Sequence, residues 1–207
     1  MSPLLLGLDA GGGSARALLL DTERGPLAVA RRDDAWTAPE RREWVVRSTA
    51  QEMAENTVDA AHFRFVHKTN TVPETEKASI RDHILHVVAN NRVATPRGEQ
   101  RGRIEIQAHG FGLGITRVSG IAGLLVVTSG SPVDDDHNHT RLQFAVKKLA
   151  NSDTTRGVGK AFIAEIERQF AQDIPIWENK IHLERPLLVE GEREIVLFRR
   201  WAKQFYS

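Results

Sequence analysis

The strongest candidate for a chemical site is the stretch from Glu55 to His67, in which two imidazoles follow a carboxylate. His62 and His67 are five residues apart, and Asp59 precedes His62 by three residues. Two imidazoles suit a first-row transition metal and leave room for a carboxylate ligand and open coordination positions. On a regular helix the two rings would point about 140° apart, so binding one ion requires a helix end or a π-bulge between them. The alternative is a helix with two incidental histidines, and the spacing favours neither.

Asp173 is the candidate third ligand, because it lies within the apolar stripe of a predicted long helix. Apolar residues and this one carboxylate recur every three or four positions, at Phe162, Ile166, Phe170, Asp173, Trp177 and Ile181. A buried carboxylate without a partner is costly, and a bound cation would remove that cost. The alternative is that Pro175 breaks the helix and that Asp173 only caps its second half.

The elements that position these residues predict an α+β fold. Residues 48–67 form a predicted helix, with Ser48 or Thr49 as N-cap and Glu52 following it. From Ile84 to Leu149 alternating and short apolar runs, separated by glycine and aspartate clusters, predict antiparallel strands. A curved sheet between this helix and a long C-terminal helix is the expected arrangement.

Residues 1–39 differ in character from the rest of the chain. Two apolar runs, Leu4–Leu8 and Ala17–Leu20, flank a glycine-rich turn and predict a β-hairpin. The polar stretch that follows, up to Pro39, is a predicted linker. We therefore expect a short leader before a single domain over residues 40–207.

Composition excludes several classes of protein. The 207 residues include 28 basic and 27 acidic side chains, and this net charge of +1 argues against a general nucleic-acid binder. No apolar run approaches the ~20 residues of a membrane span, and the N-terminus lacks the basic region of a signal peptide. The chain has no cysteine, which excludes disulfides, thiolate nucleophiles, cysteine-ligated zinc and an iron–sulfur cluster held by this chain. We expect a cytoplasmic protein.

Two further stretches are weaker candidates. Residues Asp134–His139 contain acidic side chains and histidines, but acidic turn residues before a strand are more often solvated than bound to metal. The glycines of His109–Gly114 suggest a nucleotide-binding loop, yet they lack the required strand-to-helix context. Glycines between two strands more often mark a bulge or a close approach to a ligand, so we expect this loop to border a substrate cavity.

The spacing Asp59-x-x-His62-x-x-x-x-His67 resembles the iron-binding motif of the catalytic domain of Rieske non-heme iron oxygenases. The similarity is greatest to the steroid branch, which contains the oxygenase components of 3-ketosteroid 9α-monooxygenases and the cholesterol 7-desaturases. Four later segments resemble the same branch in the same order: Pro132–His137, Phe170–Trp177, Arg185–Leu188 and Arg199–Tyr206. The resemblance covers roughly residues 40–207.

This resemblance implies a helix-grip fold (START/Bet v 1-like), with a curved sheet around the long helix and an apolar cavity between them. It implies that His62, His67 and Asp173 bind a mononuclear Fe(II) and leave positions for O₂ and substrate. It also implies that Asp59 bridges a ligand histidine to the Rieske centre of a neighbouring subunit and passes the electron. Asn56 would face the iron region.

Family members carry a Rieske domain before the catalytic domain, and without cysteine this chain cannot hold its [2Fe–2S] cluster. The resemblance therefore implies a monooxygenase or desaturase domain that uses O₂ on a steroid-like molecule. Its electrons would come from an external Rieske- or ferredoxin-type donor and a flavin reductase, and a homotrimer is a further family expectation. The alternative function is a catalytically silent module that binds a sterol or another apolar ligand in the same cavity.

Residues 6–16 are similar to the N-terminus of sugar kinases of the xylulokinase–glycerol kinase family. In that family the glycine turn contacts ATP phosphates through backbone N–H groups. A hairpin without the two large kinase domains cannot phosphorylate a sugar, so we reject a kinase function. We interpret residues 1–39 as a fusion or truncation scar, and residues 40–207 as a catalytic domain that lacks its Rieske domain.

Overall fold

The structure is a computed structural model that describes the backbone of residues 4–11, 14–21, 25–31, 36–69, 72–95, 98–120, 122–189 and 192–206. Its contacts divide the chain into two compact units, Met1–Ala38 and Pro39–Ser207. The expected boundary at Pro39 thus lies beside the boundary between the units. Each unit is described by itself.

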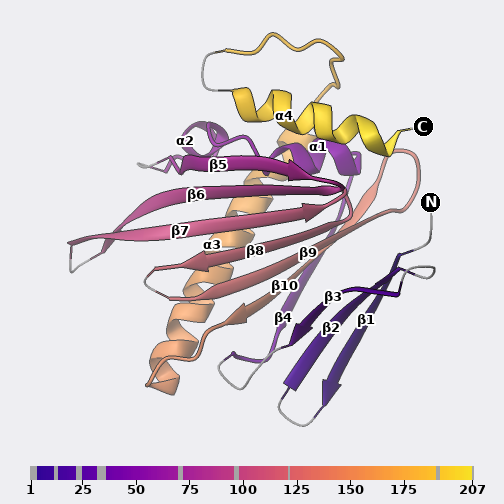
Figure 1. The fold of residues 1–207 in the computed structure, drawn as a ribbon. Helices are drawn as coiled ribbons and strands as arrows, with labels where there is room; N and C mark the ends of the chain where they lie inside the picture. The colour runs from indigo at the N-terminus through magenta and orange to yellow at the C-terminus, as the bar shows by residue number, and fades with distance from the viewer. Residues whose placement is uncertain are drawn as a thin grey trace. The chain divides into compact units, whose positions relative to one another are not determined.

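The first unit contains a three-stranded antiparallel sheet in the order β1-β2-β3 (Figure 1). The predicted hairpin is confirmed as β1 (Leu4–Gly11) and β2 (Ser14–Asp21). The third strand, β3 (Gly25–Arg31), lies in the stretch that we expected to be a linker, so that expectation was wrong. A hairpin leaves the outer edge of β2 with unpaired backbone groups, and β3 pairs with that edge.

The second unit is built on an antiparallel sheet whose described strands follow the order β4-β10-β9-β8-β7-β6-β5. Their bounds are β4 Glu40–Val46, β5 Glu74–Arg81, β6 Ile84–Thr95, β7 Gly98–His109, β8 Leu113–Ser119, β9 Leu124–Pro132 and β10 Asn138–Val146. The strands predicted between residues 84 and 149 are confirmed. We missed the two edge strands, β4 and β5, because charged residues interrupt their apolar alternation, as is common where one strand face meets solvent.

The helix predicted over residues 48–67 is two short helices, α1 (Ala50–Glu55) and α2 (His62–Phe65), with turns between them. The predicted N-cap is confirmed for Thr49, whose Oγ1 accepts a hydrogen bond of 3.3 Å from the backbone N–H of Glu52. The expectation of one continuous helix was wrong. Asparagine, threonine and aspartate side chains in the intervening segment compete with the helical backbone for hydrogen bonds.

The long helix is confirmed as α3 (Ser152–Asn179), which crosses one face of the curved sheet (Figure 1). It continues through Pro175, so the alternative in which this proline breaks the helix is wrong. The helix ends at Asn179, and Ile181, which we placed on its apolar face, lies beyond the end and is exposed. A separate helix, α4 (Arg193–Ala202), and a 3₁₀ turn, Lys203–Phe205, follow.

Two apolar clusters form the core, one on each side of the space beneath the sheet. One joins α3 to the strands β4, β9 and β10 and includes Val46, Leu124, Leu142, Phe144, Ile163 and Phe170. The other joins α4 to the strands β6 and β7 and includes Val58, Leu85, Val87, Ala108, Phe198 and Trp201. The helices therefore pack against different halves of the sheet and leave a cavity between the clusters.

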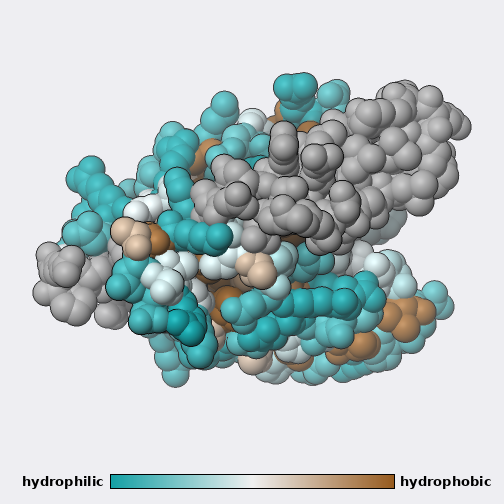
Figure 2. Space-filling model, turned by 90° about the horizontal axis from the view of Figure 1, so that it is seen from below, coloured by the Kyte–Doolittle hydropathy of each residue, from teal (hydrophilic) through white to brown (hydrophobic). Residues whose placement is uncertain are grey.

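Hydrophilic side chains predominate among the coloured residues on the face that Figure 2 shows, and hydrophobic ones form small separate groups. Among the described helices, none has the length and apolar character needed to cross a membrane.

Candidate metal centre

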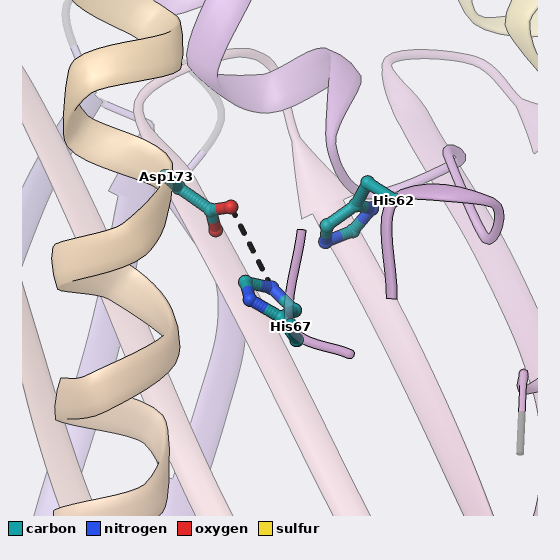
Figure 3. Close-up of side chains that lie close together, drawn as sticks. All are labelled: His62, His67 and Asp173. Atoms are coloured by element: carbon teal, nitrogen blue, oxygen red, sulfur yellow. Dashed lines mark ion pairs between the residues drawn. The ribbon is translucent and has the colours of Figure 1, made fainter. Parts of the chain in front are cut away.

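His62, His67 and Asp173 converge on one point beneath the sheet (Figure 3). Each offers one possible ligand atom, and these atoms all lie within 4.8 Å of one another. Nε2 of His67 is 3.5 Å from Oδ1 of Asp173. Ligand atoms bonded to one ion at about 2.1 Å and at right angles lie about 3 Å apart, so small side-chain rotations would close the set on a single ion.

The end of α2 brings the two imidazoles together. The helix ends at Phe65, and the backbone N–H of His67 donates to the carbonyl of His62 at 3.4 Å, one residue farther than in an α-helix. Lys68, the next residue, has a left-handed φ of 55° and directs the chain away. As a result the two ring centroids lie 4.9 Å apart in an edge-to-face arrangement, although a continuous helix would separate the rings.

In both imidazoles Nδ1 donates a hydrogen bond to an oxygen, and this bond orients the ring. Nδ1 of His67 lies 3.1 Å from Oε1 of Gln172, and Nδ1 of His62 contacts the backbone carbonyl of Asp59. Both acceptors hold the proton on Nδ1 and leave Nε2 with a free lone pair. Burial lowers the pKa of His62 and of His67, despite opposing contributions from these hydrogen bonds. Both rings are therefore neutral at neutral pH, as metal ligation requires.

Asp173 is a buried carboxylate, only 7% exposed, with no Lys or Arg ion-pair partner among the described residues. Burial raises its pKa to about 7; a hydrogen bond with the Asn56 side chain opposes the rise, and the nearby Asp59 charge adds to it. A divalent cation would stabilise the anionic form in place of a proton. Two neutral imidazoles and one carboxylate suit a divalent transition metal with open positions, so the residues present fit Fe(II).

Asp59 lies next to the site but does not point into it as a ligand. Its Oδ1 accepts a hydrogen bond of 3.2 Å from the backbone N–H of His62, and Oδ2 lies 4.0 Å from Nδ1 of the same residue. The backbone carbonyl of Asp59, rather than its carboxylate, makes the closer contact with the His62 ring. The carboxylate is about one-third exposed, so it faces the outside of the protein as well as His62, a candidate ligand.

A cavity of about 280 Å³ opens directly on these residues. Besides the three candidate ligands, its walls are mainly apolar and include Val87, Ala89, Ile104, Ile106, Ile166 and Phe170. A second cavity of about 130 Å³ shares Met53, Thr57, Ile106, Thr128, Phe170 and Trp177 with the first. The shared walls indicate one elongated space that leads away from the metal centre.

The loop between β7 and β8 lines the far part of this space. Gly110, Phe111, Leu113 and Gly114 all border the second cavity, and Gly110 adopts a left-handed φ of 68°. A side chain there would strain the turn. The glycines of this loop therefore border a cavity. We expected the loop to border the cavity that binds substrate.

Asn138 is a polar residue in the cavity that the sequence reasoning missed. It is 3% exposed, lines the second cavity, and its Oδ1 has no hydrogen-bond partner among the described residues. Nε1 of Trp177 also has no hydrogen-bond partner among the described residues. The signal was present in β10, where Asn138 and Thr140 occupy the face that Leu142 and Phe144 continue. Polar residues on an inward face mark a place where the core is open.

In the turn Asp134–His139 the three aspartates are exposed, and none of its residues belongs to the candidate ligand set. Oδ1 of Asp134 accepts hydrogen bonds from the backbone N–H groups of Asp136 and His137, at 2.9 and 2.7 Å. These bonds, and an Nδ1 contact from His137 at 2.9 Å, lower the pKa of Asp134. The carboxylate caps its own turn.

Comparisons with known proteins identify a family profile and relatives that match most of this chain. A family profile described as "3-Ketosteroid 9alpha-hydroxylase C-terminal domain" matches residues 24–206, beginning within the first unit. A 3-ketosteroid-9-alpha-monooxygenase oxygenase component of Rhodococcus rhodochrous is 31% identical over 176 residues, which are 77% of this chain and 46% of the relative. A cholesterol 7-desaturase of Xenopus laevis is 26% identical over 214 residues, covering 84% of this chain and 46% of the relative.

Solved structures share the fold at low sequence identity. A structure of NdmA from Pseudomonas putida CBB5 with caffeine has a TM-score of 0.61 at 15% identity, covering 95% of this chain and 73% of that one. Dicamba monooxygenase bound to dicamba has a TM-score of 0.58 at 13% identity, covering 83% and 59%. The expected α+β fold is thereby confirmed.

The family profile spans most of the chain, and the chain spans about half the length of the curated relatives it matches. The profile, the identity to the monooxygenase component and the shared fold agree with one another. This chain therefore belongs to the family of 3-ketosteroid 9α-hydroxylase C-terminal domains.

Proposed function

We propose that residues 40–207 form the catalytic domain of an iron-dependent oxygenase that hydroxylates or desaturates a steroid-like molecule. The observation that carries this proposal is the set of partly buried His62 with buried His67 and Asp173, which opens on an elongated apolar cavity. The monooxygenase and desaturase names of the relatives support the reaction type and the steroid substrate.

In this proposal Nε2 of His62, Nε2 of His67 and the Asp173 carboxylate hold Fe(II). The metal supplies O₂ activation, for which the protein has no side chain of suitable redox chemistry. Gln172 and the Asp59 carbonyl keep the two rings in the tautomer that binds metal. The Asn56 side chain holds the Asp173 carboxylate.

The cavity walls orient the substrate and exclude water. Aliphatic side chains from β6, β7 and α3 face a flat apolar molecule and bury its surface. Phe170 packs between Trp44 and Trp177, with ring centroids 4.3 and 5.0 Å away, so this wall is rigid. At the other end the unpaired Oδ1 of Asn138 can accept a hydrogen bond from a hydroxyl group of the ligand.

The electrons must come from another polypeptide or domain, because this chain has no cysteine to hold a [2Fe–2S] cluster. We propose a Rieske- or ferredoxin-type donor that is reduced by a flavin reductase, as the name "oxygenase component" of the relatives suggests. The partly exposed Asp59 carboxylate is the proposed entry point of the electron. A homotrimer, a cytoplasmic location and the leader interpretation of residues 1–39 remain predictions.

A binding module without chemistry is the second candidate function. The apolar cavity, with an unpaired amide oxygen and an unpaired indole N–H on its walls, favours ligand binding whether or not a metal is present. A bound sterol would satisfy Asn138 Oδ1 through a hydroxyl donor.

Hydrogen peroxide distinguishes the two functions, because it carries both the oxygen atom and the two electrons that hydroxylation consumes. The protein is loaded anaerobically with Fe(II), mixed with a 3-ketosteroid and peroxide, and the products are analysed by mass spectrometry. The oxygenase proposal predicts a product about 16 Da heavier than the steroid for hydroxylation, or about 2 Da lighter for desaturation, in the parent and not in Asp173→Ala. Tight steroid binding with no metal-dependent product would favour the binding module.

A further inference from the structure

Two buried glutamates on α1 take no part in the proposed reaction. Glu52 and Glu55 are each 5% exposed, although α1 is only six residues long. Carboxylates are rarely buried to this extent unless they are paired. Their partners come from the segment after α3 and from α4, far along the chain.

Arg199 of α4 forms two hydrogen bonds with the Glu55 carboxylate. Its Nε donates to Oε2 at 2.8 Å and its Nη2 donates to Oε1 at 3.2 Å, the bidentate arrangement that fixes a carboxylate most firmly. Lys180 lies between the two glutamates, with its Nζ 2.9 Å from Oε1 of Glu55 and 2.8 Å from Oε2 of Glu52. Arg199 also donates to the carbonyl of Leu183, which fixes the guanidinium itself.

Helix α1 depends on such contacts for its position. A helix of six residues is too short to be stable by itself, and its conformation must come from what holds its ends. At its start Thr49 provides the N-cap. At its end the carbonyl of Glu55 accepts from the N–H of Val58 at 3.1 Å, and Val58 packs into the cluster that contains Phe198. Charge pairing and packing thus tie the end of α1 to α4.

The residue after Glu55 connects this end to the candidate metal centre. Asn56 is the C-cap of α1, its side chain lines the same cavity as Asp173, and its proximity lowers the pKa of the Asp173 carboxyl. An amide can reach that carboxylate only if the last turn of α1 keeps its place relative to α3. Glu55 is the residue directly before Asn56, and its ion pairs with Arg199 and Lys180 hold this last turn of α1 in position.

We propose that Glu55, held by Arg199 and Lys180, is a positioning residue for the metal centre: it places Asn56 against Asp173 and so sets the orientation of the only anionic ligand. The proposal rests on the proposed function in one respect, namely that these three ligands bind a divalent metal. It assigns α4, which supplies none of the three candidate metal ligands, a part in metal affinity.

The test uses the full chain and Co(II), whose visible absorption bands report the geometry of its ligands. The variant Glu55→Met/Arg199→Met replaces the ion pair by apolar side chains of similar length, a change that buried pairs often tolerate. Glu55→Gln keeps the shape of the side chain and weakens the grip, in case the double variant fails to fold. Glu76→Gln is the matched control, because Glu76 pairs with Arg103 at 2.6 Å on the exposed face of the sheet.

We expect the double variant to bind Co(II) about 10-fold more weakly, within the range for residues that orient ligands, with altered absorption bands. Glu55→Gln should shift the bands in the same direction, and Glu76→Gln should match the parent. Asn56→Ala should reproduce the loss. Because Glu55 acts through Asn56, adding Asn56→Ala to the double variant should cause no further loss, whereas independent effects would multiply.

Parent-like affinity and bands in the double variant or in Glu55→Gln would overturn the positioning role while leaving the metal centre intact. Losses that multiply on combination with Asn56→Ala would also overturn it, because a general loosening of the fold weakens binding without passing through Asn56. A parent chain that binds no Co(II) would instead reject the proposed function, and the positioning role with it.

Discussion

Nε2 of His67 lies 3.5 Å from Oδ1 of Asp173, although one residue follows α2 and the other lies within α3. Neither side chain could be buried at low cost without a partner. Their closeness, together with His62, places a negative charge and two neutral imidazoles around one point beneath the sheet (Figure 3). The properties of Asp173 therefore lead to the first prediction.

Asp173→Asn should raise the stability of the metal-free protein at pH 8 and lower its metal affinity. The pKa of Asp173 rises to about 7 from an ordinary 3.8. Between these values the folded chain binds a proton that the unfolded chain has released, so stability falls as pH rises through this window. The shift corresponds to on the order of 4 kcal/mol. Urea unfolding of the metal-free chain at pH 5 and pH 8 measures the part of this loss that falls above pH 5, roughly 3 kcal/mol.

The same variant should bind Fe(II) or Co(II) at least ~10–100-fold more weakly, since even residues that only orient ligands have effects of that size. In the parent, added metal should stabilise the fold more at pH 8 than at pH 5, because the ligands must be deprotonated to bind. Equal metal affinity in the parent and in Asp173→Asn would place the metal elsewhere.

Asp59→Ala should leave metal binding largely intact and abolish turnover with a separate Rieske-type donor. The His62 ring is oriented by the backbone carbonyl of Asp59, which the substitution retains. The carboxylate, which bonds the His62 backbone N–H and is partly exposed, is lost. Metal titration and product analysis on the same sample measure the two effects. Oxygenation at the parent's rate in Asp59→Ala would exclude this carboxylate as the entry point.

Lys180→Met should destabilise the fold by about 3 kcal/mol at pH 7, because it leaves two buried carboxylates with fewer partners. Burial acts to raise the pKa of Glu52, but hydrogen bonds from Lys180 and His182 offset it, so the pKa lies below its ordinary value. The ionised Glu52 carboxylate therefore stabilises the fold at pH values above the pKa that this group has in the unfolded chain. The contribution is lost as pH falls through the pKa that the group has in the folded chain. Urea unfolding from pH 7 to pH 3 should therefore show the difference between variant and parent shrinking below about pH 4. The exposed Lys203 supplies the control, Lys203→Met.

Gly114→Val should weaken steroid binding at least about 10-fold and leave metal affinity unchanged. Gly114 lines the second cavity, and a Cβ at this position would lie 3.6 Å from Cβ of Thr128, an ordinary contact. The larger side chain would occupy ligand space without a backbone clash. Fluorescence titration with a 3-ketosteroid and Co(II) titration measure the two affinities. If steroid affinity is unchanged, the ligand does not extend into the second cavity.

Limited proteolysis should cut the chain first between residues 33 and 39, because the boundary between the two compact units falls between Ala38 and Pro39. The fragment that starts near residue 39 should keep its Co(II) affinity, since all three candidate ligands lie in the second unit. Mass spectrometry of the fragments locates the cut. Loss of metal binding on cleavage would show that residues 1–39 support the fold of the second unit.

Local sequence determined the elements whose patterns are strong. The period of three to four residues from Phe162 to Trp177 predicted a long helix and the inward position of Asp173, because a helix aligns such residues on one face. Alternating and short apolar runs predicted antiparallel strands between residues 84 and 149, where β6 to β10 lie. The edge strands β4 and β5 and the extra strand β3 were not predicted, because pairing with a neighbouring strand, rather than their own composition, stabilises them.

The candidate ligands were named from residue types and a family resemblance, but the sequence left open whether they could meet. His62 and His67 face one point only because α2 stops after four residues and the chain turns there. Asn138 entered the site only when β10 took its register against β9, since a shift of one residue would turn it to the other face. Packing between distant segments decides which buried polar groups share one cavity. The spacing of residues along the chain does not predict this.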